Sequence, residues 1–470
     1  MADSLKFGTS GLRGLAVDLI GAPSAWYTRA FLASPAVRGS LAPGGDVLVG
    51  RDLRRSSPAI AASVMGAIAE AGYRPLDCGE VSTPALAHFA MGRAAPAIMV
   101  TGSHIPADRN GLKFYRPSGE ITKDDEAGIA ESLAKVGRGS APSVSGEAAA
   151  PQARAAYLAR YAVFRPDSLA GMSIGVFQHS SVLRDDLVTA LESLGALVVP
   201  LGRENQFVPI DTEALSAEVV AQARRWVAAH RLDALVSTDG DADRPLVADE
   251  RGAFVRGDVV GMLTARFLGA DAVVTPVTSN SAIEGLGFAR VVRTKVGSPY
   301  VIAGMDEAKR AGARVVVGFE ANGGVLLGTP VMVDGGRIEA LPTRDALLPI
   351  LSALVGARRQ RMTVSQLVAT LPTRVARSDR LEHVPQEKTA AFLARLADPA
   401  FAACYFAEAG GIAARSDIDG LRFALASGDV VHYRGSGNAP ELRCYTEAAT
   451  AERADALLAW GLDAAEREVR

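Results

Sequence analysis

The sequence has only three cysteines in 470 residues, and Cys78, Cys404 and Cys444 form no CxxC pair. This scattering offers neither a disulfide framework nor a thiolate metal site, and it favours a reducing compartment. An excess of one charge is also missing, because 50 basic and 52 acidic residues give a formal net charge of -2. The balance therefore indicates no general surface for nucleic acid or for an anionic membrane.

Long apolar runs are absent as well. The first residues, Met1 to Lys6, lack the apolar core of a signal peptide, and no run approaches the ~20 residues of a membrane span. We therefore expect a cytoplasmic protein with no membrane partner. Hydrophobic residues still make up 49% of the chain, and a prior of ~150 residues per domain suggests about three domains.

A strand, a helix and a second strand follow one another three times. In the first copy, Asp46 to Gly50 reads as a buried strand, Ser57 as the N-cap of a helix with Pro58 at its first position, and Arg74 to Leu76 as the next strand. The order recurs at 173–199 and at 272–292, where Ser281 and Glu284 are spaced as in a capping box. Such βαβ units predict α/β domains with parallel strands.

The pattern changes after about Thr373. A helix at 386–396 is followed by short alternating strands at 421–424, 430–433 and 441–445, and by a closing helix from Ala451, which predicts an α+β domain. The expected fold is three related α/β domains plus a C-terminal α+β domain. Their expected bounds are 1–150, 151–253, 254–371 and 372–470.

One loop presents a hydroxyl at the end of a buried strand. Ile98 to Val100 is apolar, Thr101 and Gly102 permit a sharp turn, and Ser103 and His104 follow. Lys113 comes a few residues later, on a predicted return strand. A hydroxyl so placed, with a cation nearby, is a candidate covalent phosphoryl carrier. The alternative is a polar loop whose serine caps a turn.

Three carboxylates follow another apolar strand. Asp239, Asp241 and Asp243 are spaced at i, i+2 and i+4, with Arg244 next to them. A loop or extended segment brings such residues together, whereas a helix would spread them. Clustered oxygen ligands suit Mg²⁺, and without a cation the carboxylates would repel one another. The alternative is a solvated acidic turn.

Two further polar loops follow predicted strands. Glu320 and Asn322 lie in a glycine-rich loop, where a carboxylate and an amide can bind neighbouring sugar hydroxyls. Arg434, Ser436, Gly437 and Asn438 lie in another loop, where arginine can fork onto a phosphate. Each loop has a plain alternative, a polar turn for the first and a hairpin turn with a surface arginine for the second.

Together these stretches resemble the α-D-phosphohexomutase superfamily. The resemblance is carried by FGTSGLRG (7–14), TGSHIPADRNGLKFY (101–115), DGDADR (239–244), GFEANGG (318–324) and RGSGNAP (434–440), in family order along nearly the whole chain. It implies four domains around a central cleft, and an intramolecular phosphotransferase that acts on a hexose phosphate. Neither nucleic acid nor a membrane is an implied partner, and the protein is expected to be a monomer or a homodimer.

The resemblance also implies a role for each residue. Ser103 would be the phosphoserine, and Ser103, Asp239, Asp241 and Asp243 would bind Mg²⁺. Hexose 1,6-bisphosphate would be the activator. The other catalytic residues would be Arg13, His104, Lys113 and Arg244. The substrate would be bound by Lys295, Glu320, Asn322, Arg434, Ser436, Gly437 and Asn438.

This sequence departs from many members of the superfamily in two loops. Asn322 and Gly324 stand where a serine and a histidine are common, and Ser298 stands where some members have histidine. The Glu-Ala-Asn-Gly-Gly form is similar to that of bacterial enzymes acting on mannose phosphates, so mannose is expected, with glucose or both sugars as alternatives. Two other classes stay open, a haloacid-dehalogenase-like phosphatase using Asp239 and a non-catalytic phosphosugar sensor.

Overall fold

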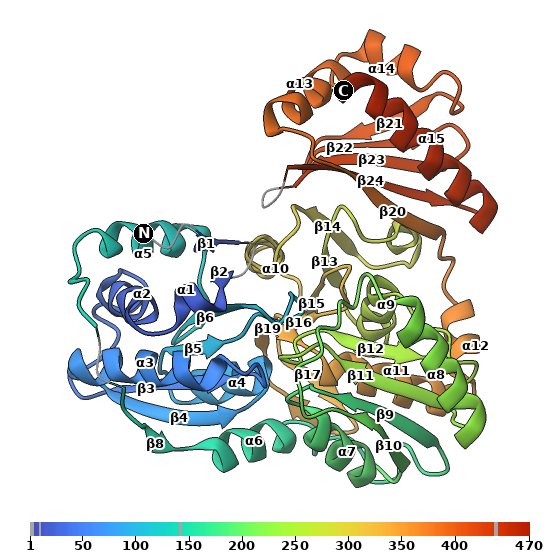
Figure 1. Ribbon diagram of the computed structural model, residues 1–470. Coiled ribbons are helices and arrows are strands. Elements are labelled where there is room, and N and C mark those ends of the chain that lie inside the picture. Colours follow the sequence, from blue (N-terminus) through green and yellow to red (C-terminus); the bar gives the residue numbers. More distant parts are fainter. Residues whose placement is uncertain (1–3, 9–10, 141–142, 437–439) are drawn as a thin grey trace. The chain divides into compact units, whose positions relative to one another are not determined.

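The computed structural model describes residues 4–8, 11–140, 143–436 and 440–470. The chain forms two compact units, each built from two segments. Unit 1 contains Met1–Val273 and Gly297–Val368, and unit 2 contains Val274–Val296 and Ala369–Arg470. The first boundary falls within strand β13 (Ala272–Pro276) (Figure 1).

The first sheet of unit 1 has the strand order β1-β2-β6-β5-β3-β4-β8, and β7 pairs with β6. Strand β3 is parallel to both β5 and β4, and β4 is parallel to β8. On the other side of β5, β6 is antiparallel to β5, and β2 is antiparallel to β6. The predicted parallel arrangement is thus confirmed for the part of the sheet from β5 to the edge strand β8. The strands are β1 (Lys6–Phe7), β2 (Leu12–Leu15), β3 (Asp46–Arg51), β4 (Arg74–Glu80), β5 (Ala97–Val100), β6 (Arg109–Arg116), β7 (Gly119–Glu120) and β8 (Glu147–Ala148).

Alanine-rich helices cover this sheet. Helices α2, α3 and α5 pack together, and their apolar side chains form one buried cluster with those of β3, β5 and β6. Burial of this apolar surface is what stabilises the layered arrangement. The helices are α1 (Ala16–Leu19), α2 (Ala22–Ala33), α3 (Ser57–Glu70), α4 (Thr83–Gly92), α5 (Lys123–Leu133) and α6 (Ala150–Ala159).

A second sheet in unit 1 has the order β10-β9-β11-β12. Strands β10 and β11 are parallel to β9, and β11 and β12 form an antiparallel hairpin whose connection carries the acidic loop at 239–244. The elements are β9 (Ser173–His179), α7 (Arg184–Ser193), β10 (Leu197–Arg203), α8 (Ala217–His230), β11 (Ala234–Thr238) and β12 (Pro245–Ala248).

The last part of unit 1 contains antiparallel strands. Strand β16 pairs with both β15 and β19, and the short hairpin of β17 and β18 lies between β16 and β19 in the chain. The elements are α9 (Gly257–Phe267), α10 (Ser298–Arg310), β15 (Val316–Phe319), β16 (Val325–Leu327), β17 (Val331–Val333), β18 (Gly336–Ile338), β19 (Leu341–Asp345), α11 (Leu347–Gln360) and α12 (Val364–Ala369).

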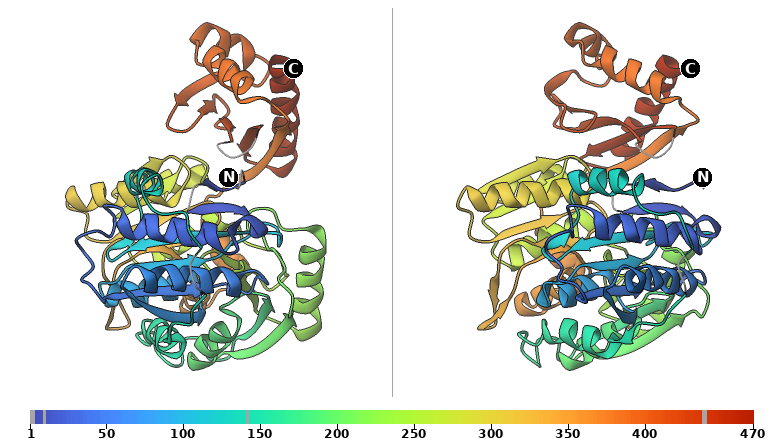
Figure 2. Two further views of the ribbon diagram at one scale, coloured as in Figure 1. Left: turned by 60° about the vertical axis from the view of Figure 1, so that its left-hand side comes forward. Right: turned by 90° about the vertical axis from the view of Figure 1, so that its left-hand side faces the viewer.

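Unit 2 contains an antiparallel sheet of order β20-β24-β23-β22-β21. Helix α15 lies along this sheet and contacts β20 and β24 (Figure 2), and aromatic residues such as Phe392, Phe406 and Tyr433 fill the core. The predicted α+β domain is confirmed. The elements are η1 (Ser281–Gly285), β14 (Arg290–Thr294), β20 (Val375–Glu382), α13 (Gln386–Leu396), α14 (Pro399–Tyr405), β21 (Ile412–Ser416), β22 (Leu421–Leu425), β23 (Val430–Gly435), β24 (Glu441–Ala448) and α15 (Ala451–Val469).

Two predicted helix caps are wrong. Ser57 is the first residue of α3, and its hydroxyl donates to Asp52 Oδ1 (2.5 Å) instead of capping the helix. Residues 281–285 form a 3₁₀ turn capped by the side chain of Asn280, and Glu284 pairs with Arg293 (2.7 Å). In both places another side chain takes the polar group that the local pattern assigned to the backbone.

The three cysteines are free thiols. Among the described helices, none is both long and apolar enough to cross a bilayer.

Candidate active site

Ser103 lies at the turn that follows β5. Its backbone has φ +52°, a left-handed conformation that is uncommon for a residue with a side chain, and the residue is fully buried. Thr101 holds this turn, because its Oγ1 accepts a hydrogen bond from Ser103 N (2.8 Å) and donates one to Asp52 Oδ2 (2.7 Å). An unusual backbone conformation held by buried polar contacts is typical of functional sites.

Arg54, which the sequence analysis missed, fixes the rest of the Ser103 loop. Its guanidinium lies 3.9 Å from the Phe207 ring centre and pairs with Asp52 (3.1 Å). The same guanidinium donates to four carbonyl oxygens of the loop. These belong to Ser103 (2.9 Å), Ile105 (2.6 Å), Pro106 (2.6 Å) and Arg109 (3.0 Å).

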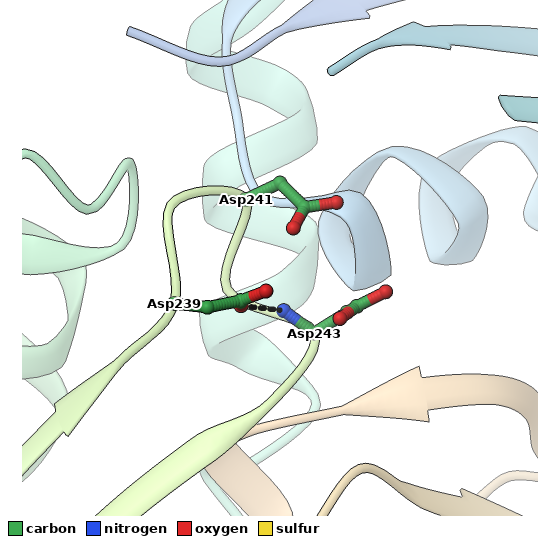
Figure 3. Close-up of side chains that lie close together, drawn as sticks. All are labelled: Asp239, Asp241 and Asp243. Atoms are coloured by element: carbon green, nitrogen blue, oxygen red, sulfur yellow. Dashed lines mark hydrogen bonds between the residues drawn. The ribbon is translucent and has the colours of Figure 1, made fainter. Parts of the chain in front are cut away.

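The acidic loop joins β11 to β12 and carries all three aspartates (Figure 3). All three are buried. One carboxylate oxygen from each of Asp239, Asp241 and Asp243 lies within 4.8 Å of the others. Burial, and next the charges of Asp241 and Asp243, raise the pKa of Asp239 well above its usual range. Such a cluster is stable in its charged form only beside cations.

Some carboxylate oxygens of this loop have hydrogen-bond partners, and others have none within the described residues. Lys113 Nζ lies 2.6 Å from Oδ2 of both Asp241 and Asp243, and Thr83 Oγ1 donates to Asp241 Oδ2 (2.6 Å). Asp241 Oδ1 and Asp243 Oδ1 are buried and have no hydrogen-bond partner within the described part of the chain. Two unpartnered buried carboxylate oxygens, with a third aspartate beside them, fit a hard divalent cation such as Mg²⁺.

The structure brings the predicted serine to the predicted acidic loop. Ser103 Oγ donates to Asp239 Oδ2 over 2.5 Å, although the two residues are 136 positions apart. His104 Nδ1 lies 3.4 Å from the same hydroxyl. Burial, followed by the charges of Arg244 and Arg13, lowers the pKa of His104 far below its usual value, so its imidazole is neutral at pH 7.

Several cations surround these acidic groups. Arg244 Nε lies 3.9 Å from Asp239 and 3.7 Å from Asp243, and it has no hydrogen-bond partner among the described residues. Burial, and then the charges of Arg244 and Arg344, lower the pKa of Arg13 to about 10. Arginines that repel one another in a buried place indicate a site for an anion.

The glycine-rich loop after β15 places Glu320 and Asn322 differently. Glu320 Oε2 accepts from Arg344 Nη1 (2.8 Å), whereas Asn322 Oδ1 accepts from the backbone N–H of Gly324 (3.0 Å). Ser298, one of the departures noted above, is buried and donates to Glu120 (2.6 Å). Arg344 was missed by the sequence analysis, because it lies inside β19 and belongs to none of the motifs.

In unit 2, one aspartate joins two predicted binding segments. Asp419 Oδ2 accepts from Arg434 Nε (2.9 Å) and from the backbone N–H of Val296 (2.9 Å), the neighbour of Lys295. Ser436 N donates to Glu441 O (3.0 Å). Gly437 and Asn438 lie outside the described residues, as do Thr9 and Ser10.

Comparison with known proteins identifies the family. Residues 4–138, 155–252 and 256–375 match the phosphoglucomutase/phosphomannomutase family, as its alpha/beta/alpha domains I, II and III respectively. The chain therefore belongs to this family, within the α-D-phosphohexomutase superfamily. The predicted fold class is confirmed by these three domains together with the C-terminal antiparallel sheet.

Two curated relatives match almost end to end. The chain is 49% identical to a phosphomannomutase of Sinorhizobium fredii (97% of this chain and 98% of the relative). It is 43% identical to a phosphomannomutase of Salmonella muenchen (96% and 93%). A putative phosphomannomutase of Thermus thermophilus shares the fold, with a TM-score of 0.76, 23% identity and coverage of 99% of this chain and 100% of that one.

Proposed function

We propose that this protein interconverts mannose 6-phosphate and mannose 1-phosphate through phosphorylated Ser103 and a hexose 1,6-bisphosphate. The contact between Ser103 Oγ and Asp239 Oδ2 carries the proposal, because it sets a nucleophilic hydroxyl against a buried acidic cluster. The two bacterial relatives named phosphomannomutase support mannose as the sugar.

The acidic loop is proposed to bind Mg²⁺. Asp239, Asp241 and Asp243 would supply three oxygen ligands, and a phosphate oxygen on Ser103 would supply another. When bound, the cation would offset the negative charge of the phosphoryl group being transferred.

Positively charged side chains of the protein would offset the same negative charge. Lys113 already pairs with both Asp241 and Asp243, and Arg244 carries a buried Nε without a hydrogen-bond partner in the described chain. A phosphoserine carries a charge of about -1.5 to -2. Phosphoryl transfer depends mainly on positioning and on charge neutralisation, and we assign both tasks to Arg13, Lys113 and Arg244.

In the proposed reaction, a sugar hydroxyl oxygen attacks the phosphorus on Ser103. A new P–O bond to the sugar forms, the P–Oγ bond breaks, the sugar hydroxyl loses its proton and Ser103 Oγ gains one. We assign this proton exchange to His104, which follows Ser103, and to Lys113 in β6, as the family resemblance implies. The bisphosphate then turns over and returns its other phosphoryl group to Ser103.

The remaining predicted residues bind the substrate in this scheme. Glu320 would accept hydrogen bonds from sugar hydroxyls. Asn322 would support the same loop through the hydrogen bond that its Oδ1 accepts from the backbone N–H of Gly324. The phosphate that is not transferred is proposed to bind Lys295, Arg434, Ser436, Gly437 and Asn438. Hexose 1,6-bisphosphate would prime the unphosphorylated enzyme. The cytoplasmic location and the state of monomer or homodimer stay predictions.

The test is a coupled mutase assay with Mg²⁺ and a hexose 1,6-bisphosphate primer. Mannose 1-phosphate, glucose 1-phosphate and glucosamine 1-phosphate are compared, with Ser103→Ala beside the wild type. Ser63→Ala is the control, because Ser63 lies in α3 and its hydroxyl donates to Ala59 O of the same helix. We expect mannose 1-phosphate to turn over fastest, and Ser103→Ala to lose about a thousandfold or more in kcat.

Each other outcome has a definite meaning. Similar rates with mannose and glucose would make the enzyme a dual-specificity mutase. An acid-labile phosphoprotein, with Ser103→Ala still active, would favour Asp239 as the nucleophile. Absence of turnover with every sugar would contradict the proposed function.

A further inference from the structure

Position 324 has no room for a side chain. A Cβ atom built on Gly324 would lie 2.6 Å from Arg344 Cδ, 2.8 Å from Arg344 Cγ and 2.9 Å from the carbonyl oxygen of Asp243. All three distances are shorter than ordinary van der Waals contact. The methylene chain of Arg344 thus lies where a residue at 324 would begin, and 324 is the position at which many superfamily members have histidine.

The guanidinium of Arg344 joins two loops of the site. Its Nε and Nη2 donate to Asp243 Oδ2 (3.0 and 2.7 Å), and its Nη1 donates to Glu320 Oε2 (2.8 Å). Only 3% of the residue is exposed. One planar group therefore sets the orientation of a carboxylate in the acidic loop and of the carboxylate in the glycine-rich loop.

The neighbours of Arg344 in β19 hold it in place. Thr343 Oγ1 donates to Glu120 Oε1 (2.6 Å), and Asp345 Oδ1 accepts from Tyr157 OH (2.6 Å) and from Leu347 N (3.0 Å). These contacts are buried, so a shift of the strand would leave several polar groups without partners. Arg344 is accordingly held on a rigid strand rather than on a loop.

We infer that Arg344 is a positioning residue that couples the cation site to the sugar site, in the space left by the glycine at 324. Together with Lys113 it holds Asp243 Oδ2, which leaves for the cation Oδ1, an oxygen that makes no hydrogen bond within the described residues. It also fixes Glu320 for the sugar hydroxyls. The inference rests on the proposed function for the sugar, while its cation half can be measured without turnover.

The test uses two substitutions of Arg344. Arg344→Met keeps much of the packing and removes the charge, whereas Arg344→Lys keeps the charge without the fork that reaches both carboxylates. Arg160→Met is the matched control, because Arg160 is also a buried arginine (7% exposed) and its guanidinium makes no hydrogen bond to either loop within the described residues. Mn²⁺ binding to the free protein is measured by electron paramagnetic resonance. KM and kcat are measured in the mutase assay with mannose 1-phosphate.

We expect Arg344→Met to raise both the Mn²⁺ dissociation constant and KM about tenfold, an amount in the range for loss of one charge-assisted contact. Arg344→Lys should recover one of the two values and not both. A purely structural role would lower the melting temperature in all three variants and leave both constants at the wild-type values, and that result would overturn the inference.

Gly324→Ala gives a second test that leaves Arg344 in the chain. The added methyl group displaces the arginine stem, so we expect the same paired rise in the Mn²⁺ constant and in KM. An unchanged pair of constants in a folded Gly324→Ala protein would contradict the inference. If the wild type turns over no sugar, the proposed function fails, and Mn²⁺ binding to the variants still decides whether Arg344 positions Asp243.

Discussion

The acidic loop of unit 1 and the Arg434 loop of unit 2 differ in how far their charged groups are exposed to solvent. Asp239, Asp241 and Asp243 are at most 1% exposed, and each contacts a hydroxyl or a cation. Arg434 has a side chain that is 14% exposed, and its partner Asp419 is 18% exposed. Charges that are shielded from water interact strongly with one another, so the folded protein must fix their positions before substrate binds. A partly hydrated ion pair is weaker and can exchange partners at little cost in free energy.

The comparison predicts the largest loss at the acidic loop. Asp241→Asn keeps the shape of the side chain and removes one buried charge that also holds Lys113. We expect kcat to fall about a thousandfold, since a bound cation supplies several kcal/mol of charge stabilisation. Removal of divalent cations with EDTA should abolish turnover, and added Mg²⁺ should restore it in the wild type.

The control for this substitution is Asp167→Asn, at an exposed position. Wild-type turnover is expected for that protein. An Asp241→Asn enzyme with near wild-type kcat would show that the acidic loop is not part of the chemical step, and would remove the contrast between the two loops.

A smaller effect is predicted for the Arg434 loop. Arg434→Ala removes a cation proposed to hold phosphate, so we expect KM for mannose 1-phosphate to rise about a hundredfold, with Mn²⁺ binding unchanged. Steady-state kinetics and electron paramagnetic resonance measure the two quantities. Arg377→Ala is the control, because Arg377 pairs with Asp455 in the same unit. A change in Mn²⁺ binding would contradict the separation of roles.

The smallest effect concerns stability in acid. Burial lowers the pKa of His432 to about 4, and its Nε2 donates to Asp419 O (2.6 Å). An unfolded histidine titrates near 6.5, so the unfolded state binds more protons between pH 6.5 and 4. The stability contributed by this neutral histidine is complete above pH 6.5 and is lost as the pH falls, by about 2 kcal/mol at pH 5.

His432→Gln removes the titrating group and should reduce the difference in stability between pH 7 and pH 5 in unit 2. Hydrogen exchange of peptides from 421–448 measures it. His179 in unit 1 has a pKa lowered by burial to about 4 as well, so peptides of unit 1 serve as the internal control and should keep their acid sensitivity. Equal acid sensitivity of unit 2 in variant and wild type would disprove the assignment.

The sequence was most informative where function depends on short segments. Asp239, Asp241 and Asp243 are close because one hairpin connection carries all three, so their spacing alone predicted the cluster. The meeting of Ser103 with Asp239 needed the family resemblance, because the residues belong to different sheets. The roles assigned to individual residues stay predictions until the variants are measured.

What the sequence could not provide is the set of residues that support the site from ordinary positions. Thr83 lies in the first turn of α4, Arg54 follows β3, and Arg344 lies inside β19. None belongs to a motif, and each reaches the site only through tertiary packing. The caps expected at Ser57 and Ser281 were wrong for a local reason. The Ser57 hydroxyl donates to Asp52 Oδ1, and the side chain of Asn280, one residue before Ser281, caps the 3₁₀ turn.

The division of the chain within β13 limits how the protein can be dissected. Because unit 2 includes Val274–Val296 as well as Ala369–Arg470, the polypeptide passes from one unit to the other three times. A single protease cut near residue 368 would leave Lys295 and Arg434 on different fragments. The hydrogen bond from Val296 N to Asp419 Oδ2 would then join two separate chains. Expression of unit 2 alone therefore calls for joining two distant stretches through a new connection, and simple truncation would not provide it.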